Sequence, residues 1–464
     1  MMSSKETRRT EGRGQLERIP RGKVRVRTQG RVALPPNLAR VNEAVRRDGR
    51  TRFTALLHHV DGASLRRAFQ RLKRSASPGV DGKTVATYEE HLEENLRDLR
   101  ERVHSGRYRP LPARRAYIPK LDGGKRPLGI LSLEDKIVQG AVAETLSAIY
   151  EVDFLGLSYG FRPRRSPHDA LGALHTGLMT QYVNWVLDAD IRKFFDSVDH
   201  EWLLRMLAHR IADRRILRLI RSWLRAGILE RGEWVETKEG TPQGAGISPL
   251  LANVFLHYVL DLWFHHWRRN RARGRVILVR YCDDFVVGFQ YKSDAQRLVS
   301  DLRSRFAKFG LAFHEEKTRL IEFGRLPALA RARRGLRRPE TFAFLGFTHY
   351  CAWTRDGRFV VKRKTEGKRL AAKVKALRSK LRRRMHDPIG RQHEWLCQVL
   401  RGHYAYFGIS CNTPALRAYF REAKRLWFRS LRKRSQRSNM TWQRFSDLLE
   451  ILPLPLPHLA HARL

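Results

Sequence analysis

Two adjacent carboxylates, Asp283 and Asp284, lie between two short runs rich in β-branched and aromatic residues, 276–281 and 285–289. This pattern predicts a β-hairpin with both carboxylates at its tip. Like charges this close repel each other, and an apolar neighbourhood removes the water that would screen them. A divalent cation such as Mg²⁺ would relieve that repulsion because it prefers hard oxygen ligands. An Asp-Asp pair alone more often only fills a turn, so a catalytic interpretation requires a third carboxylate and a group that binds phosphate.

The third carboxylate is expected in the segment 183–199. An apolar strand, 183–187, leads into Asp188 and Asp190, and their spacing of two places both on one face of a strand. We interpret Asp190 as the candidate metal ligand and Asp188 as a weaker second candidate. Asp196 and Asp199 stand where helix N-caps are expected, so we assign them a structural role.

A candidate phosphate clamp lies in the segment 117–130. Two extended pieces are joined by an Asp-Gly-Gly turn, with Lys120 on one arm and Arg126 on the other. The forked guanidinium and the compact ammonium could together hold the oxygens of a triphosphate. The alternative is a basic hairpin that only keeps the edge of a sheet solvated.

A Gly- and Pro-rich loop, 240–249, lets the backbone approach a ligand closely, and Gln243 is its one bidentate hydrogen-bonding side chain. The loop lacks the G-x-x-x-x-G-K-[ST] spacing of a P-loop, which argues against an ATPase. After it we expect a helix over 250–267, a helix over 293–309, extended chain over 311–323, a basic linker over 325–338 and a strand pair near 342–347.

The composition indicates a polyanionic partner. The 92 Lys and Arg residues exceed the 46 Asp and Glu residues, so the formal net charge is +46. Such an excess repels itself unless a polyanion neutralises it, which favours nucleic acid. No apolar run is long enough to span a membrane, so no membrane partner is expected. The four cysteines form no C-x-x-C pair, which argues against a disulfide framework and a cysteine zinc site and fits a cytoplasmic protein.

The helical patterns are unevenly distributed along the chain. Residues 1–50 are polar and basic with little periodicity, and we expect a disordered arm there. Residues 53–99 show helical periodicity. Beyond residue 362 we expect three amphipathic helices whose polar faces are dense in Lys and Arg. Together with the total charge, this density favours an RNA surface over a plain helical bundle.

Several motifs in this layout resemble those of a reverse transcriptase and, more narrowly, of the group II intron-encoded reverse transcriptase and maturase. Each motif is weak or moderate alone, but their order is specific. The resemblance covers residues 51–437. The motifs are Ser77-Pro78-Gly79-Val80-Asp81-Gly82, Pro119-Lys120-x-Asp122-Gly123-Gly124-x-Arg126, Asp190-Ile191-x-x-x-Phe195-Asp196, Pro242-Gln243-Gly244-x-x-x-Ser248-Pro249, Tyr281-x-Asp283-Asp284 and Leu400-Arg401-Gly402-His403-Tyr404.

The resemblance implies an α+β, right-hand polymerase fold, with fingers and a palm that carries an antiparallel catalytic sheet, followed by an α-helical thumb or maturase domain. We therefore predict a basic, disordered arm (1–50), fingers with the triphosphate-clamp hairpin (51–165), a palm with the catalytic carboxylates (166–360), a helical thumb (361–437) and a short tail that could be a DNA-binding remnant (438–464).

The resemblance also implies roles for individual residues. Asp190, Asp283 and Asp284 would be catalytic and would hold two Mg²⁺ ions, with Mn²⁺ able to replace them. The family usually has Ala where Cys282 stands, and the thiol could make the site sensitive to oxidation. Substrate contacts are implied for Lys120 and Arg126 on the triphosphate, Phe195 over the sugar, Gln243 along the nascent base pair, Lys317 near the phosphates, and Ile191 and Pro242 beside them. RNA contacts are predicted for Arg382, Arg383, Arg401, His403 and Lys424.

The implied function is an RNA-directed DNA polymerase of a group II intron that also binds the intron RNA as a maturase, in splicing and retrohoming. Its partners would be the intron RNA, an RNA template with a DNA primer, target DNA and deoxynucleoside triphosphates. We expect it in the cytoplasm, associated with the nucleoid of a bacterium. Many relatives append a zinc-bearing endonuclease. Because no Cys pair is present and the sequence ends soon after the third thumb helix, we expect none here.

Two alternatives stay open. One is a non-catalytic RNA-binding maturase, although a relict site has no need for three intact aspartates. The other is a related reverse transcriptase that serves phage defence or mutagenic retrohoming. The mutagenic variant typically carries Ser-Gln where this chain has Ser248-Pro249, and such proteins lack the Leu-Arg-Gly motif.

Overall fold

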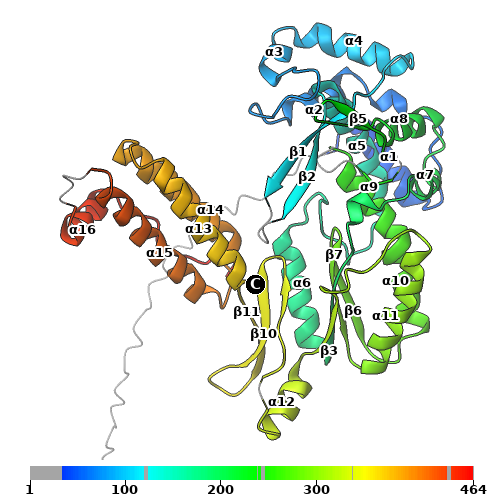
Figure 1. Cartoon of the computed structure of the whole chain (residues 1–464). Coiled ribbons are helices and arrows are strands. Elements are labelled where there is room, and N and C mark those ends of the chain that lie inside the picture. The colour runs from blue at the N-terminus through cyan, green and yellow to red at the C-terminus, as the bar shows by residue number, and fades with distance from the viewer. Residues whose placement is uncertain are drawn as a thin grey trace, which may run out of the picture. The chain divides into compact units, whose positions relative to one another are not determined.

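The computed structural model describes residues 34–119, 124–237, 239–241, 246–336, 338–435 and 440–462, which all belong to one unit, Leu34–Leu464. The fold is α+β, as predicted, with helices, three separate sheets and a helical C-terminal region (Figure 1).

The first part of this unit is mainly helical and packs on one long helix, α5 (Leu133–Asp153). The helix begins where the side chain of Ser132 accepts a hydrogen bond from the backbone N–H of Asp135, which satisfies one free donor of the first turn. Twelve residues of α5 are buried, so it is the core of this region. Two helices, α1 (Pro36–Arg47) and α2 (Gly62–Gln70), pack directly on α5. The same core also includes residues of α3 (Val85–Glu89), α4 (Leu92–His104), α7 (His200–Ala208) and α8 (Arg214–Leu224).

A four-stranded sheet adjoins these helices, with the strand order β2-β1-β4-β5. The strands β1 (Ala113–Pro119) and β2 (Lys125–Ile130) pair antiparallel, which confirms the two extended pieces predicted around the Asp-Gly-Gly turn. The strand β4 (Ile228–Glu230) joins β1 in parallel, and β5 (Glu233–Val235) completes the sheet.

The central sheet is antiparallel, with the order β6-β7-β3-β8. Because side chains alternate along a strand, Leu278 and Val287 belong to one core with α11, and Val279 and Val286 belong to the other core with α6. Its elements are β3 (Trp185–Asp190), β6 (Val276–Tyr281), β7 (Asp284–Phe289) and β8 (Arg319–Glu322), with α6 (Pro167–Thr180) and α11 (Lys292–Ala307) on its two faces.

The third sheet leads into the C-terminal helices. Its strand order is β11-β10-β9, and it shares the α6-side core of the central sheet. The three predicted amphipathic helices are present, and Trp427 lies fully buried among them. The elements are β9 (Phe342–Phe344), β10 (Phe347–Trp353), β11 (Phe359–Thr365), α13 (Gly367–Arg383), α14 (Ile389–Phe407), α15 (Thr413–Arg432) and a fourth helix, α16 (Trp442–Ile451).

Two expectations of local structure are wrong. Residues 36–47, expected within the disordered arm, form α1, because Leu38, Val41 and Val45 share one face and are buried in the core. The expected basic linker contains a helix, α12 (Arg325–Arg333). The helical stretch expected over 250–267 is confirmed, and it consists of α9 (Ser248–Leu256), a π-helical turn, His257–Asp261, and α10 (Leu262–Asn270).

Among the described helices, none combines the length and the hydropathy needed to cross a membrane. The predicted boundaries between fingers, palm and thumb stay predictions, because Leu34–Leu464 forms a single compact unit.

Asp213 connects two segments that are far apart in sequence. It is the N-cap of α8 and is 2% exposed, and its Oδ2 accepts hydrogen bonds from the backbone N–H groups of Leu56 (2.8 Å) and Leu57 (3.0 Å). Burial alone raises the pKa of Asp213, but hydrogen bonds from Arg215, Leu56 and Leu57 outweigh it and lower the pKa to about 2. The ionised carboxylate therefore stabilises the fold.

We expect Asp213→Ala to destabilise the protein by about 2–4 kcal/mol at neutral pH, because two buried N–H groups lose their acceptor. A lowered pKa means that the carboxylate's contribution is present above about pH 4 and is lost as the pH falls towards 2, so the difference from wild type should shrink on acidification. Urea unfolding across this pH range measures it. Asp213→Asn, which keeps one oxygen acceptor, should lose less stability, and equal stability of wild type and Asp213→Ala at neutral pH would contradict the assignment.

Candidate active site

Three carboxylates meet at one end of the central sheet. The turn between β6 and β7 contains Asp283, and β7 begins with Asp284. In the neighbouring strand, Asp190 is the direct antiparallel partner of Asp284. Asp190 and Asp283 are 93 positions apart in sequence (283 − 190), so only the pairing of β3 with β7 brings them together. Asp188 lies two residues earlier on β3, opposite Val286.

Burial and repulsion between neighbouring carboxylates raise the pKa values of Asp188, Asp283 and Asp284. For Asp284 burial is the larger cause, followed by the charges of neighbouring aspartates, and its pKa lies well above the usual range. Burial also raises the pKa of Asp283, and repulsion from Asp190 adds to it. Burial raises the pKa of Asp188 to about 6, although Arg319, 3.5 Å from its carboxylate, favours the charged form. The cluster therefore favours binding of protons or of a cation.

Cations from three different elements surround the cluster. The ammonium of Lys317 lies 2.9 Å from Oδ2 of Asp190. The positive charge of Arg126, on β2, lowers the pKa of Asp283, which places this predicted clamp residue within electrostatic reach of the carboxylates. Arg369, on α13, acts in the same direction on the pKa of Asp284. Lys317, predicted near the phosphates, thus lies directly on a carboxylate in this structure.

The donor set suits a hard divalent cation, since Asp190, Asp283 and Asp284 offer only oxygen ligands. Within the described ranges, no three His, Cys, Asp or Glu side chains are already arranged to hold a metal ion, and Asp190 pairs with Lys317. A cation bound here would compete with Lys317 for Asp190. It would also relieve the repulsion that raises the pKa of Asp284.

A buried ion pair holds the turn between β6 and β7 that contains Asp283, which we name the acidic turn. Arg280 and Asp261 are both fully buried, and Nε and Nη2 of Arg280 donate to the two carboxylate oxygens of Asp261 at 2.8 and 2.5 Å. Nη1 of Arg280 also donates to the carbonyl oxygen of Cys282 at 2.9 Å, and to Oδ1 of Asn253 at 3.0 Å. Arg280 therefore holds the backbone immediately before Asp283.

The same network closes on the other side of the turn. Nδ2 of Asn253 donates to the carbonyl oxygen of Gly160 at 2.7 Å. A Cβ on Gly160 would lie 2.4 Å from the backbone nitrogen of Cys282, so only glycine allows this approach. Cys282 itself has a left-handed φ of 60°, a conformation that costs a non-glycine residue about 1–3 kcal/mol and persists only where the surroundings enforce it. The hydrogen bonds of Arg280 and Asn253 hold Cys282 in this conformation.

Cys282 is enclosed by this arrangement. Its side chain is 3% exposed, and burial raises the pKa of the thiol above its usual value. Oxidants react with an accessible thiolate. The structure therefore contradicts the expectation that this thiol makes the site sensitive to oxidation.

The predicted sugar contact, Phe195, lies in a short 3₁₀ turn after β3 and lines a cavity of about 380 Å³ together with Arg115 and Pro127. The backbone N–H of Thr241 donates to the carbonyl oxygen of Phe195 at 2.7 Å, which anchors the start of the Gly- and Pro-rich loop here. Ile191 is buried, so only its backbone is available to a substrate. Three predicted substrate contacts, Lys120, Pro242 and Gln243, lie outside the described residues.

The basic residues predicted to contact RNA lie on the C-terminal helices. Arg382 and Arg383, at the end of α13, and Arg401, on α14, are exposed. The ammonium of Lys424 lies over the rings of Phe420 and Trp442. Between α13 and α15 a cavity of about 610 Å³ has no acidic residue among the described residues that line it, and its cations are Arg378, Arg382, Arg429 and Lys433.

The structure contradicts the prediction that His403 contacts RNA. This residue is 2% exposed, and its ring stacks on Tyr419 at 3.9 Å and on Phe407 at 4.8 Å. Burial lowers its pKa to about 3, so the ring is neutral at physiological pH. Neutral and enclosed, His403 is a core residue of the helical region.

Sequence analysis missed the residues that position the acidic turn, Arg280, Asp261, Asn253 and Gly160. Asp261 is 19 residues from Arg280, and Gly160 is 93 residues from Asn253, so no local spacing connects them. One signal was available. An arginine inside the apolar run 276–281 must find a partner if that strand is buried.

Comparison with known proteins gives a consistent result. The sequence model of the family "Reverse transcriptase (RNA-dependent DNA polymerase)" matches residues 118–349, half of the chain, and this range contains all three clustered aspartates. The chain is 38% identical to Protein YkfC of Escherichia coli over 46% of this chain and 64% of that protein. It is also 38% identical to the group II intron-encoded protein LtrA of Lactococcus lactis, over 44% of this chain and 35% of that protein.

A similarity is also found to a yeast intron protein, the putative COX1/OXI3 intron 1 protein of Saccharomyces cerevisiae, at 27% identity over 57% of this chain and 37% of that protein. The chain thus spans less than two thirds of the length of each of these three relatives.

We expect Asp284→Asn to raise the thermal stability of the metal-free protein near neutral pH. A carboxyl whose pKa is raised on folding contributes stability at low pH, and that stability is lost as the pH rises through the folded-state pKa. Removing the charge of Asp284 should therefore raise the thermal stability most near pH 8 and little near pH 4. Each tenfold rise in the proton affinity of the carboxyl on folding changes the free energy of unfolding by about 1.4 kcal/mol between low and high pH. Thermal unfolding in EDTA measures this. Asp196→Asn, at an exposed position nearby, is the control, and an equal gain there would contradict the assigned repulsion.

We expect Asp261→Ala to destabilise the protein by about 3–5 kcal/mol, because it leaves the charge of Arg280 buried without its partner. The double variant Arg280→Met with Asp261→Leu replaces the pair by apolar side chains and should recover most of that stability. Urea unfolding of the three proteins gives the comparison. A double variant as unstable as Asp261→Ala would show that the buried charge is not the cause.

Proposed function

The chain belongs to the reverse transcriptase (RNA-dependent DNA polymerase) family, and on that premise we propose that it is the RNA-directed DNA polymerase of a group II intron, which also binds the intron RNA as a maturase. One observation carries the polymerase assignment, namely the register of β3 against β7 that sets Asp190 opposite Asp284 and close to Asp283. A non-catalytic maturase gains nothing from crowding carboxylates that repel each other.

In the proposed reaction the 3′-hydroxyl of a DNA primer attacks the α-phosphorus of a deoxynucleoside triphosphate. A bond forms between the primer oxygen and the α-phosphorus, the bond to the bridging oxygen breaks, pyrophosphate leaves, and the hydroxyl proton passes to solvent. The chain's residues act mainly by holding reactants in line and by balancing charge. The network around Arg280 gives this positioning a rigid base, because it holds the turn that carries Asp283.

Reverse transcriptases generally use divalent metal ions, and we propose that Asp190, Asp283 and Asp284 hold two Mg²⁺ ions, with Mn²⁺ as a substitute. Such ions lower the pKa of the attacking hydroxyl and neutralise the leaving pyrophosphate. The raised pKa values of Asp283 and Asp284 support this proposal, because a site that disfavours its own negative charge gains most from a bound cation.

We propose that the incoming nucleotide lies between β2 and the acidic turn. Arg126, with Lys120 of the same hairpin, would bind the triphosphate, and Lys317 would exchange its partner Asp190 for the phosphates. Phe195 would lie against the sugar and exclude a 2′-hydroxyl, with the backbones of Ile191 and Pro242 nearby. Gln243 would lie along the nascent base pair, in the loop that begins at the hydrogen bond between Thr241 and Phe195.

For the maturase role we propose that the cationic side of the C-terminal helices binds folded intron RNA, through Arg382, Arg383, Arg401 and Lys424. The relative LtrA is named a group II intron-encoded protein, which supports intron RNA as the partner. We assign fingers to 51–165, palm to 166–360 and thumb to 361–437. An RNA template with a DNA primer, target DNA, retrohoming and a cytoplasmic, nucleoid-associated location belong to the same proposal.

We expect Asp283→Asn to reduce primer extension on an RNA template by about 1,000-fold, equivalent to ~4 kcal/mol in the barrier, because the cation site loses a charged ligand. The measurement is incorporation of deoxynucleotides with Mg²⁺ and a DNA primer, after thermal unfolding has shown that the variant is folded. Asp356→Asn, at an exposed position between β10 and β11, should extend primers like wild type. If Asp283→Asn also did so, the catalytic assignment would be wrong and a non-catalytic maturase would be favoured.

We expect Arg382→Glu with Arg383→Glu to weaken binding of intron RNA and to reduce its salt dependence. Each lost phosphate contact should lower the slope of log K against log salt by about 0.9 or less. Arg355→Glu with Arg358→Glu is the matched control, because both residues are exposed and the double change alters the net charge by the same amount. Filter binding at several salt concentrations measures the slope. Equal losses in the two variants would show that net charge alone, rather than this surface, binds the RNA.

A further inference from the structure

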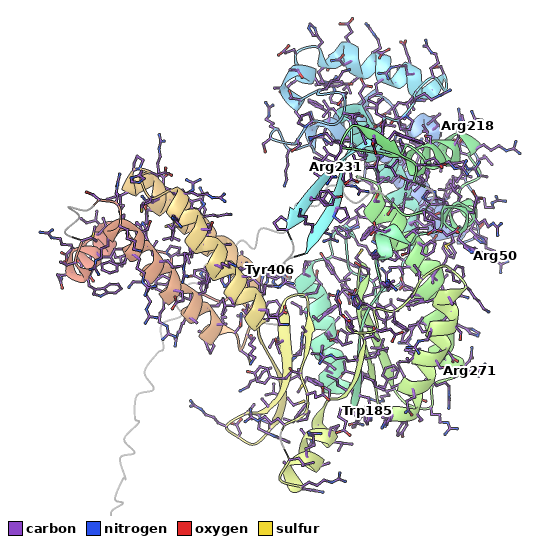
Figure 2. All side chains as sticks on the ribbon, in the orientation of Figure 1. Arg50, Trp185, Arg218, Arg231, Arg271 and Tyr406 are labelled. Atoms are coloured by element: carbon purple, nitrogen blue, oxygen red, sulfur yellow. The ribbon has the colours of Figure 1, made fainter. Side chains whose placement is uncertain are left out.

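The central sheet carries a second group of side chains at the end opposite its carboxylates, and all of them except the half-buried Trp185 are solvent-exposed. We name it the aromatic–cationic patch, and it consists of Tyr182, Trp185, Arg275, Tyr291 and Lys292. Its residues precede β3, begin β3, precede β6 or follow β7. Since strands rise by about 3.3 Å per residue, the patch lies roughly 17–20 Å from the acidic turn. Figure 2 labels Trp185 and Arg271 at this end of the sheet.

Contacts between neighbouring strand ends make the patch continuous. The guanidinium of Arg275 lies 5.0 Å from the ring centroid of Tyr182, and the ammonium of Lys292 lies 4.9 Å from that of Trp185. The backbone N–H of Arg275 donates to the side chain of Gln290 at 3.1 Å, and Gln290 donates to the hydroxyl of Tyr291 at 3.5 Å. The patch is therefore one surface assembled from three strands.

Both tyrosine rings are largely open to solvent, although one edge of the Tyr291 ring lies against Gly274. Tyr182 is 65% exposed and Tyr291 is 48% exposed. Tyr182 also has a left-handed φ of 53°, a conformation that bulky residues rarely adopt. Tyr182 directly follows the C-cap of α6, where a left-handed residue is usually Gly or Asn, so a tyrosine with an exposed ring at this position is unusual.

The positive charge of the patch is not balanced by nearby carboxylates. Within the described ranges, no ion pair involves Arg275, Lys292 or the adjacent exposed residues Arg271 and Arg273. Asp294 is buried, and its Oδ2 accepts the backbone N–H groups of Arg273 and Gly274 at 3.0 and 2.9 Å. Glu322, which pairs with Trp185 across the strands, forms an ion pair with Arg331 at 3.4 Å.

We propose that the aromatic–cationic patch binds single-stranded nucleic acid, with bases stacked on Tyr182 and Tyr291 and phosphates held by Arg275 and Lys292. Exposed rings interleaved with cations are the chemistry that single strands need, because every base has an aromatic face and every phosphate a negative charge. A duplex cannot use the rings in this way, since its bases are already stacked on each other. The patch would hold a stretch of strand outside the segment being copied.

The test uses the full-length protein and two labelled 12-nucleotide probes, oligouridine RNA and oligothymidine DNA, with fluorescence anisotropy as the readout. Tyr182→Gly with Tyr291→Ala should weaken binding of single strands by about five-fold or more, while duplex RNA of the same length binds unchanged. Gly suits the left-handed backbone at position 182, so the variant should fold. Tyr182→Phe with Tyr291→Phe keeps both rings and should bind like wild type. Comparing the two probes shows whether the patch binds RNA and DNA strands equally.

Leu326→Ala, at a 58% exposed position on α12, is the matched control for loss of exposed apolar surface and should bind like wild type. Photo-cross-linking with 5-iodouridine in the RNA probe should label peptides that contain Tyr182 or Tyr291. Unchanged binding by the ring-less variant, an equal loss for duplex RNA, or cross-links confined to other segments would each overturn the proposal. Primer extension on a short template should be unaffected by the ring-less variant, so failure here leaves the polymerase assignment standing.

Discussion

The buried pair of Arg280 and Asp261 is the interaction on which the geometry of the candidate active site depends. Its two charges are removed from water, a desolvation that is repaid only because the geometry is bidentate and the remaining donors of Arg280 reach Asn253 and the carbonyl of Cys282. An apolar pair could stabilise the core equally well. It could not donate a hydrogen bond into the turn. The pair is therefore better explained by the position it imposes on the acidic turn than by stability.

The molecule combines two electrostatic requirements that oppose each other. A net charge of +46 attracts a polyanion to the whole surface, whereas the clustered aspartates would repel the same polyanion at the point of chemistry. The structure separates the two spatially. The aspartates gather at one end of the central sheet, with Lys317, Arg126 and Arg369 around them, and many other basic residues lie on exposed helices and strand ends. These cations, and the raised pKa values of Asp283 and Asp284, reduce the negative charge that the polyanion meets there.

The sequence predicted those parts whose signals are local. Alternating apolar residues and turn residues predicted β6, β7 and the β1–β2 pair, and helical spacing predicted α13 to α15. The meeting of Asp190 with Asp284 needed the family resemblance, because strand pairing over 93 residues has no local signature. The helix α1 was not predicted because charged and polar residues lie between Leu38, Val41 and Val45, the residues of its apolar face. His403 was misjudged although the signal existed, since residues 396, 400, 403 and 407 follow helical spacing and form a buried stripe of α14.

The last described stretch of the chain has a consequence for how the protein is made. Residues 453–462 run back along α14, where the N–H of His461 donates to the carbonyl oxygen of Gly408 at 2.8 Å, and the ring of His461 stacks on that of His168 at 3.7 Å. His168 belongs to α6, beneath the central sheet. Because domains fold in order as they leave the ribosome, this joint between the early and late parts of the chain cannot form until His461 has been synthesised. Until then these two parts of the chain are joined only by segments made earlier, such as Tyr406, whose carbonyl oxygen lies 2.8 Å from the ring nitrogen of His168.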